Sequence, residues 1–262
     1  MRASWCIFKF VFLDNLRSIW SVAYALFFAL SVYSLIHFTG SFTRAVVSIM
    51  NIILLVAPLM SAMMMSMYYF NKTDFLHLLL AQPVRRWQVF LGMYLGVAFT
   101  LALSVLVGLG LGVLISLGQI DAILPLITLM ASGSLLSLIF AALAMLVSVA
   151  SKDKLRGIGL TLFVWLFLAV IYDGLILIYF IAFSEYPIEQ HAIVLSLMNP
   201  IDLSRIFIML QLDVSALLGY SGAVFHKFFG STWGQVVSLA ALMLWVVLPI
   251  LTMLRTGGKK DF

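Results

Sequence analysis

Long apolar stretches alternate with short polar breaks along nearly the whole chain. A transmembrane helix needs about 20 apolar residues to cross the hydrocarbon core of a bilayer. Six stretches reach this length, and the sequence therefore predicts six membrane-spanning helices in an all-α protein. The predicted spans cover residues 19–38, 46–70, 89–117, 123–150, 157–183 and 232–254.

The basic residues gather on one side of this six-span pattern. With the N-terminus placed in the cytoplasm, each of the four inside segments carries three lysines or arginines, and only Arg44, Arg205 and Lys227 lie outside. Cytoplasmic segments of membrane proteins carry such an excess. We therefore expect both termini in the cytoplasm. No small-residue cleavage site follows the first span, which favours an uncleaved insertion signal.

The residues before the first span differ from the rest of the chain. Residues 2–18 mix charged and apolar side chains, so they are too polar to span a membrane and too apolar to dissolve. A helix lying in the membrane interface suits this pattern. A plain cytoplasmic extension of the first span is the alternative.

The third predicted span contains glycines four residues apart. The pairs are Gly92 with Gly96 and Gly108 with Gly112. Small residues at this spacing let helices approach closely in lipid. They predict close packing of this span inside the bundle.

The segment of residues 184–231 is the only long outer loop, and it is too apolar for a solvated linker. Asn199, Pro200 and Asp202 have the chemistry of a helix start, with a cap, a proline at the first position and an acid in the first turn. They predict a short helix over 200–211. We expect it to lie on or dip into the outer membrane face, where it gates an exit or docks an outer partner. The residues expected to serve this role are Asn199, Pro200, Asp202 and Arg205.

Composition agrees with a single membrane domain over residues 1–262. Hydrophobic residues make up 64% of the chain and charged residues 10%, against roughly 25% charged in soluble domains. The formal net charge of +5 is explained by the inside segments, so no nucleic-acid partner is expected. A single cysteine excludes an internal disulfide.

Asp173 is the one acidic residue well inside a predicted span. A carboxylate embedded in a membrane is costly and is a functional candidate for that reason. Two roles remain open. Asp173 could face a translocation path, or it could form a structural ion pair with Arg205 of the outer helix.

Other chemistry is scarce. The second span holds a methionine cluster, in which Met60, Met63, Met64 and Met67 share a helical face; packing and a Cu(I) path are the alternatives. No two histidines have a metal-ligand spacing, and no P-loop, H-E-x-x-H or G-x-S-x-G motif occurs. We therefore expect no catalytic residues, metal site or cofactor in this chain.

The break between the second and third spans reads Gln-Pro-Val-Arg-Arg-Trp, residues 82–87. The leucines before it need a buried docking site, which a bare loop does not offer. The arginines keep the following turn at the headgroup level. The stretch predicts a helix ending at Ala81 that meets another protein, and a corner that anchors the third span.

The pattern resembles the ABC-2 type permeases, the membrane subunits of ABC transporters. The residues carrying this resemblance are the interfacial N-terminal segment, the six spans and the stretch LHLLLAQPVRRWQVFLGMYLG. The resemblance implies an ABC-2, type V exporter-like permease fold. It also implies a coupling helix over 73–81 that docks on a separate ATPase subunit, which binds the ATP and Mg²⁺. The residues assigned to this docking are Phe75, Leu76, Leu78, Leu79, Pro83 and Arg86.

A narrower resemblance to NosY-type permeases rests on FKFVFLDNLRSIW, PVRRWQ, YDGL and LSLMNPIDLSR. It implies a permease homodimer in the bacterial inner membrane, an ATPase partner of the NosF type and a periplasmic NosD-type protein. Such transporters serve copper-site maturation of nitrous oxide reductase. A scaffold that moves no substrate and relays ATPase motion to the periplasmic protein is the alternative, as is export of another substrate.

Overall fold

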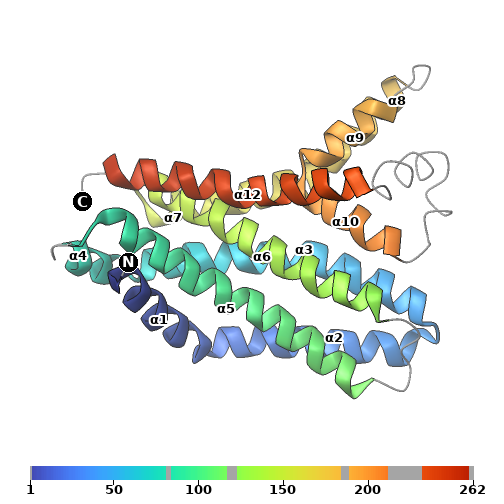
Figure 1. Cartoon of the computed structure of the whole chain (residues 1–262), viewed down its shortest axis with the longest axis horizontal. Helices are drawn as coiled ribbons and strands as arrows, with labels where there is room; N and C mark the ends of the chain where they lie inside the picture. The colour runs from blue at the N-terminus through green and yellow to red at the C-terminus, as the bar shows by residue number, and fades with distance from the viewer. Residues whose placement is uncertain (1, 81–83, 117–122, 184–188, 212–231, 260–262) are drawn as a thin grey trace.

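The structure of the chain is a computed structural model that describes residues 2–80, 84–116, 123–183, 189–211 and 232–259 (Figure 1). These residues form helices and no strand, as the all-α prediction requires. Among these residues, six helical spans are long and apolar enough to cross a membrane, and the bent helix pair His191–Leu197 and Pro200–Leu210 would be a seventh if it forms one broken span. The α-helices are α1 (Arg2–Leu16), α2 (Ile19–Thr39), α3 (Phe42–Asn71), α4 (Thr73–Leu80), α5 (Arg86–Ile115), α6 (Leu124–Ala150), α7 (Lys154–Leu166), α8 (Tyr172–Ala182), α9 (Glu189–Leu197), α10 (Pro200–Gln211) and α12 (Thr232–Lys259), with the π-helix η2 (Phe167–Ile171) between α7 and α8.

The predicted spans are found at their expected places, with shifted ends. Span three begins at Arg86, because Arg85 takes the extended backbone of an N-cap and the helix starts directly after it. Span two is longer than predicted and runs from Phe42 to Asn71. Polar residues at both ends continue these helices, which apolar length alone does not reveal.

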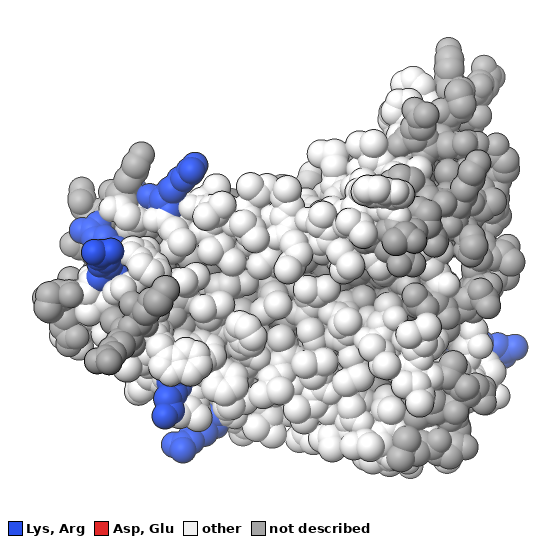
Figure 2. All heavy atoms as spheres, in the orientation of Figure 1, with Lys and Arg blue, Asp and Glu red and all other residues white. Residues whose placement is uncertain are grey.

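The chain's two ends lie at the same end of the bundle, which also holds α4; we call this the terminal end (Figure 1). The opposite end, called the far end, holds α10. On the face drawn in Figure 2, the lysines and arginines gather mainly at the terminal end. This distribution is the one that the positive-inside pattern of the sequence predicts.

The segment before the first span is a separate helix. α1 ends at Leu16, and α2 begins at Ile19 after an extended Ser18. α1 packs along the first half of α5 rather than continuing the line of α2 (Figure 1). The break required by an interfacial helix is therefore present.

α5 packs against α1, α2 and α6, and its glycines set how closely α1 and α2 approach it. A side chain at Gly96 would lie 2.5 Å from Cγ1 of Val11 on α1. A side chain at Gly108 would meet the backbone oxygen of Ala25 on α2 and lie 2.9 Å from Cβ of Phe28. The predicted close packing is confirmed, and the two glycine pairs serve different partners, since Gly92 faces Ile7 of α1 and Gly112 faces Val32 of α2.

The fifth span is interrupted in its middle. Residues Phe167–Ile171 form one π-helical turn, in which the N–H of Tyr172 bonds the carbonyl of Phe167. A π turn inserts an extra residue into the helix and frees a carbonyl from the regular ladder. Beyond it, α8 leans away from the bundle (Figure 1). The sequence predicted one unbroken helix over 157–183, because π turns have no clear signature in apolar sequence.

Candidate functional sites at the two ends of the bundle

The candidate coupling site at the terminal end is built on α4. α3 ends where the N–H of Lys72 bonds the carbonyl of Tyr68 and the backbone leaves helical geometry. α4 begins at the next residue, and the hydroxyl of Thr73 donates to the carbonyl of Phe70 at 2.9 Å. The predicted helix over 73–81 is therefore present as Thr73–Leu80. Ala81 and Pro83, the residue assigned to end it, lie outside the described residues.

The apolar side chains of α4 face in different directions. Leu76 is fully buried, whereas Leu78 is 67% exposed. Phe75 and Leu79 are half-buried. The assignment of Leu76 to docking on another protein is corrected by this burial, because its side chain contacts the bundle and fastens α4 to it. Among the leucines of α4 whose side chains the structure describes, Leu78 is the most exposed and the most accessible to another protein.

α1 holds α4 in place from the side. The ring of Phe75 lies 5.4 Å from that of Phe10 on α1, measured between centroids. Asp14 of α1 pairs with Lys72 at 3.1 Å and accepts a hydrogen bond from the hydroxyl of Tyr68 at 3.3 Å. α1 and the junction between α3 and α4 therefore form one connected unit.

The start of α5 joins this unit to the end of the last span. Nη1 of Arg86 donates to the carbonyl of Gly258 on α12 at 3.3 Å. Arg86, assigned to docking from the sequence, is thus exposed but already engaged with α12. Lys154, at the start of α7, donates to Oδ1 of Asn71 at 2.8 Å and adds the fifth span to the same end.

The second site is a corner at the far end. α9 and α10 meet at an angle of 110°. Oδ1 of Asn199 accepts a hydrogen bond from the N–H of Ile201 at 3.0 Å, and Pro200 occupies the first helical position. The predicted helix over 200–211 and its cap are confirmed. Asn199, Pro200 and Asp202 are all buried there.

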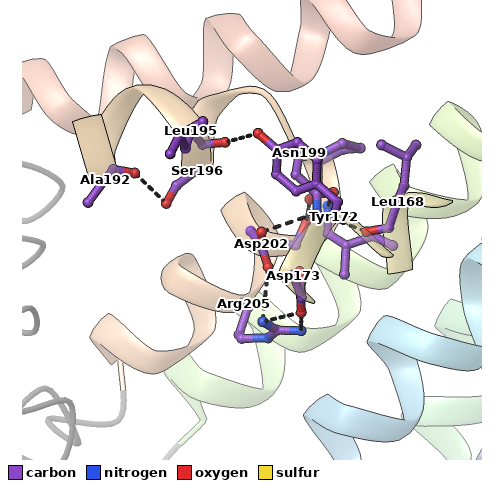
Figure 3. Close-up of polar contacts among 12 residues, drawn as sticks. Leu168, Tyr172, Asp173, Ala192, Leu195, Ser196, Asn199, Asp202 and Arg205 are labelled. Carbon is purple, nitrogen blue, oxygen red and sulfur yellow. Dashed lines mark hydrogen bonds and ion pairs between the residues drawn. The ribbon is translucent and has the colours of Figure 1, made fainter. Parts of the chain in front are cut away.

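Asn199 also explains how the π turn of the fifth span is tolerated. Its Nδ2 donates to the carbonyl of Leu168 at 2.9 Å, inside η2 (Figure 3). Nearby, the hydroxyl of Tyr172 donates to the carbonyl of Leu195 on α9 at 2.8 Å. A buried carbonyl without a partner is costly. The corner between α9 and α10 therefore supplies the hydrogen bond that the distorted helix lacks.

The guanidinium of Arg205 on α10 pairs with two carboxylates and links α10 to α8. Both terminal nitrogens of Arg205 lie 3.1 Å from Oδ2 of Asp173, and Nη1 lies 2.9 Å from Oδ1 of Asp202 (Figure 3). Of the two roles left open for Asp173, the structure shows the ion pair with Arg205. We call Leu168, Tyr172, Asp173, Leu195, Asn199, Asp202 and Arg205 the far-end polar cluster.

The electrostatics of Asp202 are unusual. Burial raises the pKa of its carboxyl to about 7, and the neighbouring charge of Asp173 acts in the same direction. The guanidinium of Arg205 opposes both effects. Two carboxylates that share one guanidinium leave one charge uncompensated, and such sites hold a proton more tightly than an isolated carboxyl.

Three members of this cluster were missed by reasoning from the sequence. Leu168, Tyr172 and Leu195 lie in apolar stretches, and their contacts depend on the π turn and on the corner between α9 and α10. The dipeptide Tyr172-Asp173 inside a span was a usable signal, since two polar side chains in lipid need partners nearby.

The structure offers little for metals. Among the described residues, no three His, Cys, Asp or Glu side chains come together in a way that could hold an ion. Met65 is fully buried in the core, Met60 and Met64 are partly buried and pack against this core, and Met67 is 42% exposed. The methionines thus divide between core and surface, as ordinary packing requires.

Comparison with known proteins adds a family resemblance to this geometry. No family model matches the chain. The protein named probable ABC transporter permease protein NosY from Pseudomonas aeruginosa is 29% identical over 237 residues, which cover 84% of this chain and 86% of the relative. The protein of the same name from Stutzerimonas stutzeri is 28% identical over 226 residues, covering 79% and 81%. With six candidate spans among its described residues, the chain is similar along most of its length to these proteins, both named as probable permease subunits of ABC transporters.

Proposed function

We propose that this permease subunit couples ATP hydrolysis by a separate ATPase subunit to movement in the membrane. The observation that carries the proposal is α4, a short helix at the basic end whose Leu76 is fully buried while Leu78 is 67% exposed. A lever must be fastened to the part it moves and must present a surface to the motor. α4 meets both requirements.

The contacts around α4 support transmission of motion into the bundle. Phe75 contacts Phe10 of α1, and α1 in turn packs against the glycines of α5. Close-packed interiors have low compressibility and transmit displacement. A push on α4 therefore reaches α5 through α1.

The proposed setting follows from charge and from the relatives. The spans cross a bacterial inner membrane, and the basic terminal end faces the cytoplasm. There it contacts an ATPase of the NosF type, which binds ATP and Mg²⁺. The far-end polar cluster then faces the periplasm, where Asn199, Pro200, Asp202 and Arg205 position a helix for a NosD-type protein. The process served is copper-site maturation of nitrous oxide reductase.

A second candidate function is a scaffold that relays ATPase motion to the periplasmic protein and moves no solute. One observation favours it. Asp173 is the only charged side chain deep within a described span, and its carboxylate is paired with the guanidinium of Arg205. A permease that exports another substrate is a further alternative.

The test of coupling is the substitution Leu78→Asp. We expect loss of the ATPase subunit from the purified membrane complex, because a charge replaces the exposed apolar contact of α4. The side chain of Leu78 is not part of the core, so the permease itself should remain folded in detergent. The measurement is the ATPase-to-permease ratio after affinity purification.

Leu155→Asp is the matched control, since Leu155 is 86% exposed at the same end but lies on α7. It should retain the ATPase. A normal subunit ratio for the Leu78→Asp protein would show that α4 is not the docking helix.

A further inference from the structure

A cavity of about 280 Å³ lies between α8, α9 and α10, beside the far-end polar cluster. Asp173, Asp202 and Arg205 line one part of it. The remaining wall is almost entirely apolar and includes Ile176, Phe180 and Met209. Sites of this kind, with apolar walls and a few convergent polar groups, are typical of binding pockets for small ligands.

The polar part of the wall carries more negative than positive formal charge. Oδ2 of Asp173 takes both nitrogens of Arg205, whereas its Oδ1 is buried without a hydrogen-bond partner among the described residues. Asp173 and Asp202 together carry two formal negative charges against the one positive charge of Arg205. A ligand that carries one positive charge and donates hydrogen bonds from it would balance this excess at the Asp173 carboxylate.

Other ligand classes fit less well. An anion would meet a net negative charge, and Arg205 is already bonded to both carboxylates. Calcium requires six to eight oxygen ligands, which these apolar walls do not offer. A proton can neutralise the excess charge, but it cannot fill the apolar part of the cavity.

We propose that this cavity binds the primary ammonium group of an amphiphile. The ammonium pairs with the carboxylate of Asp173, whose side chain is 33% exposed, and the apolar part of the ligand lies against Ile176, Phe180 and Met209. The surface of α8 continues the apolar wall, since Leu177 is 62% and Ile181 68% exposed. An aminophospholipid headgroup and a free alkylamine share this chemistry. The site needs no ATPase partner and is independent of the coupling proposal.

The first experiment tests the lipid source. The protein is placed in nanodiscs of phosphatidylethanolamine with phosphatidylglycerol, or of phosphatidylcholine with the same fraction of phosphatidylglycerol. The two zwitterionic lipids differ in that only the former can donate hydrogen bonds from its ammonium. We expect a higher midpoint of thermal unfolding, and lipid retained in native mass spectra, with phosphatidylethanolamine.

The second experiment tests the free amine. Detergent-purified protein is titrated with decylammonium, and decyltrimethylammonium serves as the probe that cannot donate. We expect decylammonium to bind about tenfold more tightly, the effect of one charge-assisted hydrogen bond. A preference in the lipid experiment alone assigns the site to a headgroup, and a preference in this one alone assigns it to a soluble amine; both outcomes support the proposal.

Two variants locate the effect. Asp173→Asn keeps the shape of the side chain and removes its charge. Leu177→Trp narrows the cavity and leaves the ion pairs intact, so it tests the same site if the Asp173→Asn protein does not fold. Each should abolish the preference for the primary ammonium. Asp153→Asn removes a carboxylate at the terminal end, where Asp153 pairs with Arg156, and should behave as the wild type. The proposal is overturned if neither experiment shows the preference, or if the preference survives in both variants.

Discussion

Asn199 shows how much one side chain decides in this protein. Its oxygen caps α10 through the N–H of Ile201, and its nitrogen bonds the carbonyl of Leu168 in the π turn. The same Nδ2 also lies 3.1 Å from Oδ2 of Asp202. One amide therefore holds together a helix start, a distorted span and a carboxylate.

Substitution of Asn199 should separate these contributions. Asn199→Ala loses the cap and leaves the Leu168 carbonyl unpaired, which should cost about 2–4 kcal/mol of stability. Asn199→Ser keeps a cap oxygen and should cost about half as much. Both values come from denaturant or thermal unfolding in one detergent.

Ser196→Ala is the control for this pair. Its hydroxyl bonds only the carbonyl of Ala192 in its own helix, so the change should stay within about 0.5 kcal/mol. Equal stability of the Asn199→Ala and Asn199→Ser proteins would mean that the cap contributes nothing.

Asp202 should make the far end sensitive to pH. α10 lies outside the six candidate spans, and burial raises the pKa of Asp202 to about 7 from an ordinary value of 3.8. A raised pKa means that folding favours the protonated carboxyl. The resulting stabilisation is complete below about pH 4 and is lost as the pH rises through about 7.

The measurement compares the wild type with Asp202→Asn, whose side chain stays neutral. The groups that face Asp202 are Asp173, Tyr172 and Arg205, and the neighbouring helix α6 has no titratable side chain. From about pH 5 to pH 8, the unfolding midpoint of the wild type should fall relative to the variant by about 5–10 °C, because about two pH units separate pH 5 from the pKa and each is equivalent to about 1.4 kcal/mol. Parallel pH profiles for the two proteins would contradict the assignment.

Among the helices, α5 determines how the others approach one another. Its first half accepts α1 at Gly92 and Gly96, and its second half accepts α2 at Gly108 and Gly112. Without hydrophobic driving force between helices in lipid, close van der Waals contact supplies much of the association. α1 and α2 can therefore both pack against α5, one after the other along its length, although the helix is broken between them.

Gly108→Ala should disrupt this packing. The new methyl group would meet the backbone oxygen of Ala25 and lie 2.9 Å from Cβ of Phe28, and neither atom belongs to a flexible side-chain end. We expect destabilisation by about 1–3 kcal/mol. Gly110→Ala is the control two residues away, where the nearest atom is Cε of Met130 at 3.6 Å. It should be neutral or slightly stabilising in the same thermal unfolding measurement, and equal loss in both proteins would exclude the packing explanation.

The whole molecule is unevenly covered. Only 6% of the most apolar window of the fifth span, Lys154–Ala182, is buried within the chain, whereas 61% of the corresponding window of α6 is buried. A helix at the edge of a bundle faces lipid or another protein. We propose that a second copy covers this span, because a symmetric dimer brings the same face of each copy together.

Cysteine cross-linking tests this dimer. In a Cys6→Ser background, single cysteines at Leu160, Phe163 and Phe167 on the exposed side of the fifth span should include at least one that forms an intermolecular disulfide in membranes. Cysteines at Phe99, Leu103 and Leu111, which are exposed on α5, should form none. Disulfides require Cα atoms within about 7 Å, so cross-links confined to α5 would move the interface away from the fifth span.

Much of this architecture was predictable because it depends on local composition. Six spans follow from runs of apolar residues long enough to cross a bilayer, and the start of α10 follows from Asn199 and Pro200. The basic residues lie mainly at the terminal end of the bundle because they fall in every second segment between the predicted spans. Each of these features is carried by neighbours in the sequence, which need no knowledge of other helices.

Other features were decided only when the helices came together. Leu76 and Leu78 are alike in sequence, yet contact with the bundle buries one and leaves the other exposed. The partner of Asp173 and the π turn beside it depend on Arg205 and Asn199, which lie more than 25 residues away. The physical reason is that burial and the pairing of polar groups are properties of contacts between elements, and lipid-facing and core-facing residues in this chain are equally apolar.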